Sequence, residues 1–107
     1  MSLPMYTNVT ILNGGTTSTT YETRGANRGS FQMPATMTGT ATTINVSNDG
    51  VNFTACPVLT GLETNPITTT GNGSYSFPVK TFNFRYLQLV SGGAEAAQRT
   101  ITITTRD

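Results

Sequence analysis

The chain has 107 residues, which is enough for one domain with a two-layer core and too few for a second domain. Charged residues make up only 10%, and the net charge of +1 excludes the strongly basic surface typical of proteins that bind nucleic acids or anionic membranes. There is no His and only one Cys, which excludes His-dependent catalytic triads, Cys/His zinc sites and an intrachain disulfide. We therefore expect no enzyme activity, no cofactor, no metal site, and no nucleic-acid or membrane partner.

The first six residues contain no charge and place apolar side chains around Pro4. Proline fixes its own φ and favours an extended conformation for the residue before it. We expect a short arm over residues 1–6, with Leu3, Met5 and Tyr6 as candidate partner contacts. This arm either packs on its own domain or reaches a neighbouring subunit. Because the start lacks a charged region and a long apolar run, we expect no signal peptide, no transmembrane helix, and synthesis in the cytoplasm.

Apolar and polar residues alternate with a period of two along the chain, and helical periodicity is absent. Threonine, which favours strands, occurs 23 times. In chain order we expect strands over 7–12, 18–22, 31–33, 42–47, 51–56, 67–70, 75–79, 84–90 and 100–105. Many short strands separated by Gly, Pro and Asn turns are typical of a β-sandwich or jelly roll. We predict an all-β fold, a single antiparallel, jelly-roll-like β-sandwich over residues 1–107 with about eight strands.

We predict a β-hairpin over 42–56, because Asp49-Gly50 between two alternating runs favours a tight turn. Asp49 could also begin a calcium loop, but the further acidic ligands and the closing Glu are missing, so we interpret it as turn chemistry. Residues 94–98 could form one helical turn, too short to be stable alone. We expect a buried, unreactive thiol at Cys56. Seven residues lie on the apolar side of their predicted strands and should form the core: Ile44, Val46, Phe53, Leu87, Leu89, Ile101 and Ile103.

Three arginines lie in expected loops or at strand ends: Arg24, Arg28 and Arg99. Arginine is enriched at protein contacts, so these are candidate interface residues; the alternative is solvated loop charge. Two further alternatives remain open. The aromatic residues could include a sugar-stacking platform instead of packing only in the core. A hydrolase would need two carboxylates about 5–10 Å apart, and the fold would have to gather them from acids dispersed along the sequence.

The second half of the chain carries a recognisable pattern of strands and turns. It runs from Gln32-Met33-Pro34 through residues 37–41, 46–53 and 84–92 to 97–103. Over residues 29–105 this pattern resembles the small β-sandwich virion proteins of tailed bacteriophages. The stretch Ser47-Asn48-Asp49-Gly50-Val51-Asn52-Phe53 also resembles discoidin-like carbohydrate-binding sandwiches.

The virion resemblance implies a structural component of a phage particle, made in the host bacterial cytoplasm. Within that class we expect a capsid decoration or cement protein that binds the major capsid protein or other virion subunits and forms a homo-oligomer. The discoidin-like resemblance implies the alternative, a carbohydrate- or receptor-binding module of a fibre or tail component.

Overall fold

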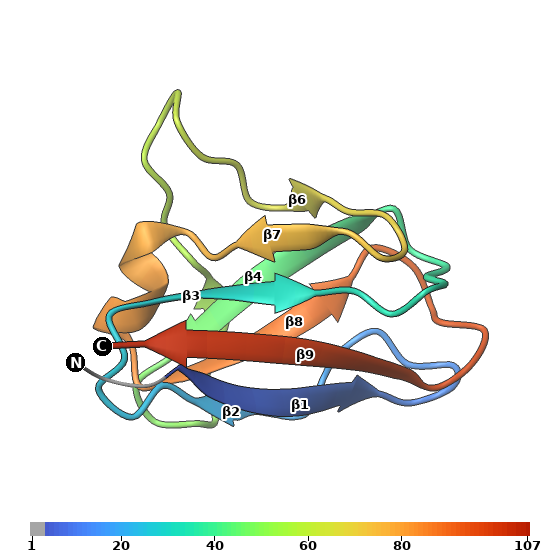
Figure 1. Ribbon diagram of the computed structural model, residues 1–107, viewed down its shortest axis with the longest axis horizontal. Helices are drawn as coiled ribbons and strands as arrows, with labels where there is room; N and C mark the ends of the chain where they lie inside the picture. The colour runs from blue at the N-terminus through green and yellow to red at the C-terminus, as the bar shows by residue number, and fades with distance from the viewer. Residues whose placement is uncertain (1–3) are drawn as a thin grey trace.

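The computed structural model describes residues 4–107, so Leu3 and the two residues before it lie outside the described part of the chain. Two antiparallel sheets pack face to face, which confirms the predicted all-β sandwich (Figure 1). The elements are β1 (Met5–Ile11), β2 (Tyr21–Glu22), β3 (Arg28–Gln32), β4 (Ala41–Ser47), β5 (Thr54–Ala55), β6 (Ile67–Thr68), β7 (Ser74–Ser76), the 3-10 helix η1 (Val79–Asn83), β8 (Tyr86–Ser91) and β9 (Arg99–Arg106).

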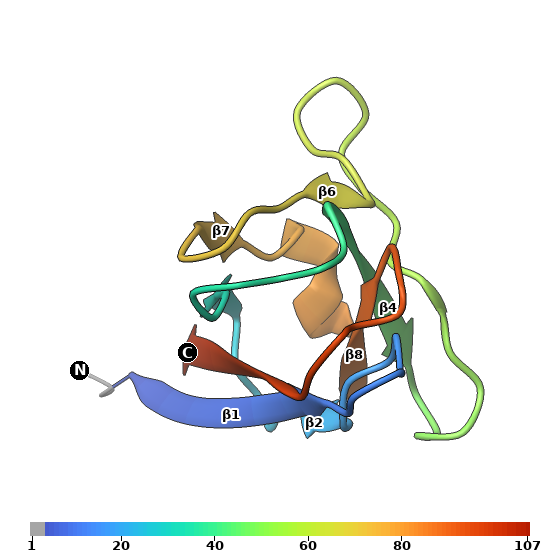
Figure 2. The same ribbon diagram turned by 90° about the vertical axis from the view of Figure 1, so that its right-hand side faces the viewer.

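The strand order is that of a jelly roll, as predicted. One sheet has the order β1-β9-β3-β7, and the other has the order β2-β8-β4-β5, with β6 also pairing with β4. The chain crosses repeatedly between the two sheets, so strands that are neighbours in sequence often face each other across the core (Figure 2). The first and last strands pair along their whole length, from Met5 opposite Thr105 to Ile11 opposite Arg99.

The core lies between the sheets and follows the period-two alternation of the strands. Six of the seven expected core residues are at most 1% exposed: Ile44, Val46, Leu87, Leu89, Ile101 and Ile103. Phe31 from β3 adds an aromatic centre, with its ring centroid 5.6 Å from that of Tyr75 and 5.0 Å from that of Phe77. Cys56 is buried at 3% exposure, as expected.

The prediction for Phe53 is wrong, because this side chain is only half-buried. The predicted hairpin is present, with Asn45 opposite Ala55, but β5 has only two residues. The carboxylate of Asp49 accepts hydrogen bonds from the backbone N–H groups of Val51 and Asn52, each at 2.8 Å. These bonds extend the turn and delay the second strand, which confirms turn chemistry at Asp49.

Among residues 4–107, helical structure occurs only in η1, which the sequence pattern does not predict. The helix η1 fills the connection between β7 and β8. The helical turn expected over 94–98 is absent, and this segment is an irregular loop. No helix within residues 4–107 is long and apolar enough to cross a membrane.

Candidate functional site

The two ends of the sandwich differ in charge. One end holds the start of β1, the finish of β9, the 23–27 connection and η1 (Figure 1). At the opposite end, the loops over 12–20, 33–40 and 92–98 contain a single charged residue, Glu95, which pairs with Arg99. All the other charged side chains belong to the first end: Glu22, Arg24, Arg28, Asp49, Glu63, Lys80, Arg85, Arg106 and Asp107.

A groove of about 700 Å³ opens at the charged end, between β1 at the edge of one sheet and β2 at the edge of the other. The hydroxyl of Tyr21 and Oγ1 of Thr105 share a buried hydrogen bond of 2.9 Å, which ties the two sheets together beside the groove. The side chains that line it are a mixture of apolar, aromatic and charged groups, including Met5, Thr7, Glu22, Arg24, Tyr86, Arg106 and Asp107.

Three exposed arginines gather beside this groove. Arg28 and Arg106 are direct neighbours across the β3–β9 pair, and Arg24 lines the groove together with Arg106. Like charges placed opposite each other on a sheet destabilise it. The ion pairs formed among residues 4–107 involve other arginines, Arg85 and Arg99. The side chains of Arg24, Arg28 and Arg106 can therefore form ion pairs with the acidic groups of a partner.

A second, smaller pocket of about 480 Å³ adjoins the arginine cluster on its other side. Arg28 and Arg106 line it together with the apolar side chains of Phe77, Val79 and Phe82. The ring of Phe77 is edge-on to that of Phe82, with centroids 5.8 Å apart. The charged end thus combines cationic side chains with apolar surface, the mixture found at protein contacts.

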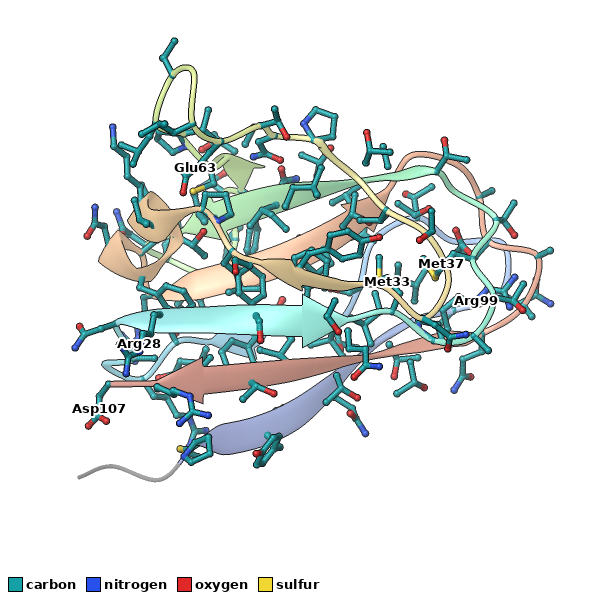
Figure 3. The ribbon with its side chains drawn as sticks, turned by 45° about the horizontal axis from the view of Figure 1, so that its top comes forward. Arg28, Met33, Met37, Glu63, Arg99 and Asp107 are labelled. Atoms are coloured by element: carbon teal, nitrogen blue, oxygen red, sulfur yellow. The ribbon has the colours of Figure 1, made fainter. Side chains whose placement is uncertain are left out.

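The candidate interface residues fall into two groups. Met5, Tyr6, Arg24 and Arg28 lie at the charged end, whereas Arg99 lies at the opposite end from Arg28 (Figure 3). Met5 and Tyr6 are not a detached arm, because both pair with β9 as the first residues of β1. Their side chains are nevertheless 57% and 68% exposed.

Arg99 is held by Glu95, whose side chain is fully buried. The Glu95 carboxylate accepts hydrogen bonds from the Thr38 N–H at 2.8 Å, the Gly39 N–H at 2.9 Å, the Ser91 hydroxyl at 2.6 Å and Arg99 Nε at 2.9 Å. Burial alone would raise the pKa of Glu95, but these bonds outweigh it and lower the pKa from the usual 4.5 to about 2. The carboxylate is therefore ionised at neutral pH, and it joins the 33–40 loop to the 92–98 loop and to the adjoining ends of β8 and β9.

Two other carboxylates also hold loops. Glu63 accepts from the Leu59 N–H through Oε1 and from the Val79 N–H through Oε2, each at 2.9 Å. At Asp49, backbone bonds from Asn52 and Val51 lower the pKa well below its usual range. Burial raises the pKa of the Cys56 thiol. Within the described chain, no three His, Cys, Asp or Glu side chains are grouped to hold a metal ion.

Sequence reasoning missed both the groove and the Glu95 site. The groove depends on which strands become sheet edges, and that has no local signal. Glu95 does leave a signal, because it is the only charged residue in the stretch from Ser91 to Gln98, with Arg99 four positions later. An acid and a base at this spacing indicate an ion pair, but nothing in this stretch indicates that the carboxylate is buried.

A solved structure from a prophage shares this fold. The crystal structure of the SPBc2 prophage-derived protein YomS matches with a TM-score of 0.64 and 11% identity, over 98% of this chain and 96% of that one. A chain from the disulfide-linked pili of Bacillus endospore appendages matches with a TM-score of 0.43 and 19% identity, over 96% of this chain and 84% of that one. No protein-family model matches the sequence, and no curated protein is significantly similar to it.

Proposed function

We propose that this protein is a non-enzymatic structural component of a bacteriophage virion, and specifically a capsid decoration or cement protein that forms a homo-oligomer. The observation that carries the proposal is the jelly-roll fold shared with a prophage-derived protein over 98% of the chain. The carboxylates of Glu63 and Glu95 accept hydrogen bonds that stabilise loops of their own domain, and this structural role agrees with a non-enzymatic protein. In this proposal the major capsid protein, or another virion subunit, is the partner.

The proposed partner surface is the part of the charged end that contains the arginine cluster and the first residues of β1, and it does not include η1. Arg24 and Arg28, with Arg106 between them, supply cationic groups, and Met5 and Tyr6 supply exposed apolar area beside them. Acidic side chains on a capsid subunit would relieve the repulsion between Arg28 and Arg106. Arg99 is not part of the proposed surface, because its guanidinium is bound to Glu95.

The test is association with particles. The chain should remain with intact particles through a density gradient, and Arg28→Glu should weaken this association by about tenfold or more. Lys80→Glu is the matched control, because it makes the same charge change on η1 outside both pockets. Absence of the chain from purified particles, or equal effects of the two variants, would contradict the proposal.

The groove favours a second candidate function, binding of a carbohydrate. Tyr86 presents a half-buried aromatic ring in a groove whose other lining groups include Glu22, Arg24 and Asp107. The guanidinium carbon of Arg85 lies 5.3 Å from the centroid of the Tyr86 ring. Aromatic rings flanked by hydrogen-bonding groups are typical of ligand pockets.

Binding of soluble oligosaccharides, followed by NMR of the chain, separates this candidate from the first. Saturable shifts confined to the groove and abolished by Tyr86→Ala would support it. Tyr6→Ala is the control, because Tyr6 is more exposed but does not line the groove. An equal loss in both variants, or no saturable shift, would contradict sugar binding.

A further inference from the structure

Within the described chain, β1 is the longest strand at the edge of a sheet. β1 has seven residues and pairs only with β9, whereas the other edge strands are β7 with three residues and β2 and β5 with two each. Proteins usually protect a long edge with charged side chains, proline or a bulge. Residues 5–12 contain neither charge nor proline.

The backbone direction along this edge follows from one contact. Thr10 donates its N–H to Thr19 Oγ1 at 3.1 Å and accepts from the Thr19 N–H at 3.0 Å, so its polar groups point away from β9. The direction of the backbone N–H and C=O groups alternates from one residue to the next along a strand, so those of Tyr6 and Asn8 also point away from β9. No described residue hydrogen-bonds to the outward backbone groups of Tyr6 or Asn8, and residues 5–8 are exposed.

We propose that a second copy of this chain pairs with this edge, antiparallel, with Thr7 opposite Thr7 of the other copy. Tyr6 then lies opposite Asn8 of the second copy and Asn8 opposite its Tyr6, so that two donors and two acceptors from each copy are all satisfied. Two-fold symmetry makes the contact self-complementary. It joins two four-stranded sheets into one continuous sheet.

The two neighbouring registers would form fewer hydrogen bonds between the copies. Placing Tyr6 opposite Tyr6 sets Asn8 against Pro4, which has no N–H. Placing Asn8 opposite Asn8 sets Tyr6 against Thr10, whose groups are already bonded to Thr19. In the part of the chain that the structure describes, Tyr6 and Asn8 are thus the two residues of this edge whose outward N–H and C=O groups are both present and unbonded. Pairing with one second copy satisfies the groups of both residues. No like charges meet, because residues 4–12 are uncharged.

This inference specifies the surface of the proposed homo-oligomer and rests on that part of the proposed function. The first experiment measures mass in solution by light scattering. Tyr6→Pro removes an outward N–H and leaves the β1–β9 bonds intact, since proline is tolerated on a strand edge. The wild-type chain and the control Tyr6→Val, which keeps the N–H, should be dimers, and Tyr6→Pro a monomer. A monomeric wild-type chain, or a Tyr6→Pro dimer, would overturn the proposal.

The second experiment tests the register and does not depend on the proline variant folding. In the proposed pair the two Thr7 Cα atoms are about 4.5 Å apart, within disulfide range, whereas the two Met5 Cα atoms are about 13 Å apart. Mild oxidation should therefore cross-link Thr7→Cys and not Met5→Cys, although both side chains lie on the same strand face. The wild-type chain controls for buried Cys56. Cross-linking of both variants to the same extent, or of neither, would overturn the register.

Failure of this pairing and failure of the capsid function give different results. If Thr7→Cys cross-links but the chain is absent from purified particles, the pairing stands and the capsid function fails. If the wild-type chain is monomeric and still associates with particles, the pairing fails and the capsid function stands.

Discussion

At the residue scale, Glu95 shows how a buried charge is made tolerable. An ionised carboxylate in the interior is costly unless it is both paired and hydrogen-bonded, and Glu95 has one arginine and three further donors. Gly39 is part of the same arrangement, because a Cβ at this position would overlap Ser91 Oγ. The donors Thr38 and Gly39 are 57 and 56 positions away in sequence, which is why the sequence predicts a pair with Arg99 at best and not the complete site.

The first prediction concerns the Glu95–Arg99 pair. Glu95→Gln removes the charge and replaces one acceptor oxygen by an NH₂ group, so Arg99 loses its counter-ion and one backbone N–H, that of Thr38 or of Gly39, loses its acceptor. We expect a loss of about 3–5 kcal/mol in the free energy of unfolding, measured in urea at pH 7. Glu22→Gln is the control: its pair with Arg85 is exposed, at 3.7 Å, and should contribute within about 1 kcal/mol. Similar losses in both variants would contradict a special role for Glu95.

At the element scale, the sequence predicts strand phase well where a strand is long. β4, β8 and β9 each bury every second residue, and the alternation of Ile44 and Val46 or of Leu87 and Leu89 is enough to assign the buried face. Short strands are harder, because two residues cannot show a period. Phe53 illustrates this, since the Asp49 side chain binds the N–H groups of Val51 and Asn52, and β5 begins only at Thr54.

The second prediction tests the phase of β8. Leu89→Ala removes a fully buried side chain from between the sheets and should lower the free energy of unfolding by about 2–5 kcal/mol. Leu62→Ala makes the same chemical change at a side chain that is 82% exposed, and should change it by less than about 0.5 kcal/mol. Denaturant unfolding of both variants measures the difference, and equal losses would show that the core is assigned incorrectly.

One gap in the second sheet is closed by a side chain in place of a strand. β6 pairs with β4 at Ala41 and Thr42, and β5 pairs with it at Asn45 and Val46. At Ile44, between these two partners, the Asn65 side chain accepts from the backbone N–H and donates to the backbone C=O, each at 2.9 Å. Asn65 thereby completes the edge of β4, as a strand residue would.

The third prediction follows from this gap. Asn65→Ala leaves the Ile44 N–H without its partner and should lower the free energy of unfolding by about 1–3 kcal/mol, because an unsatisfied buried donor carries a desolvation penalty. Asn27→Ala is the matched control at an exposed position and should change it by less than about 0.5 kcal/mol. A negligible effect at Asn65 would mean that water replaces the amide at this edge.

At the scale of the whole molecule, the jelly-roll topology brings together side chains that are far apart in the sequence. Because β9 pairs with both β1 and β3, Arg106 near the end of the chain comes to lie beside Arg28 and close to Met5. The sequence identifies Arg24 and Arg28 as loop or strand-end charges, but Arg106 joins them only through the topology. The arginine cluster is thus a property of the fold, whereas the absence of charge in β1 is visible in the sequence itself.

The last prediction is the pH dependence of stability. The pKa of Glu95 falls to about 2 in the folded chain, and that of Asp49 also falls, so both groups contribute stability above their unfolded pKa values. That contribution is lost as the pH falls from about 5 toward 2, because the folded state must then take up protons that break these hydrogen bonds. Urea midpoints should therefore decrease over this range in the wild-type chain and decrease less in Glu95→Gln. The stability difference between the two chains should shrink as the pH is lowered, and a constant difference from pH 7 to pH 3 would show that Glu95 does not titrate with folding.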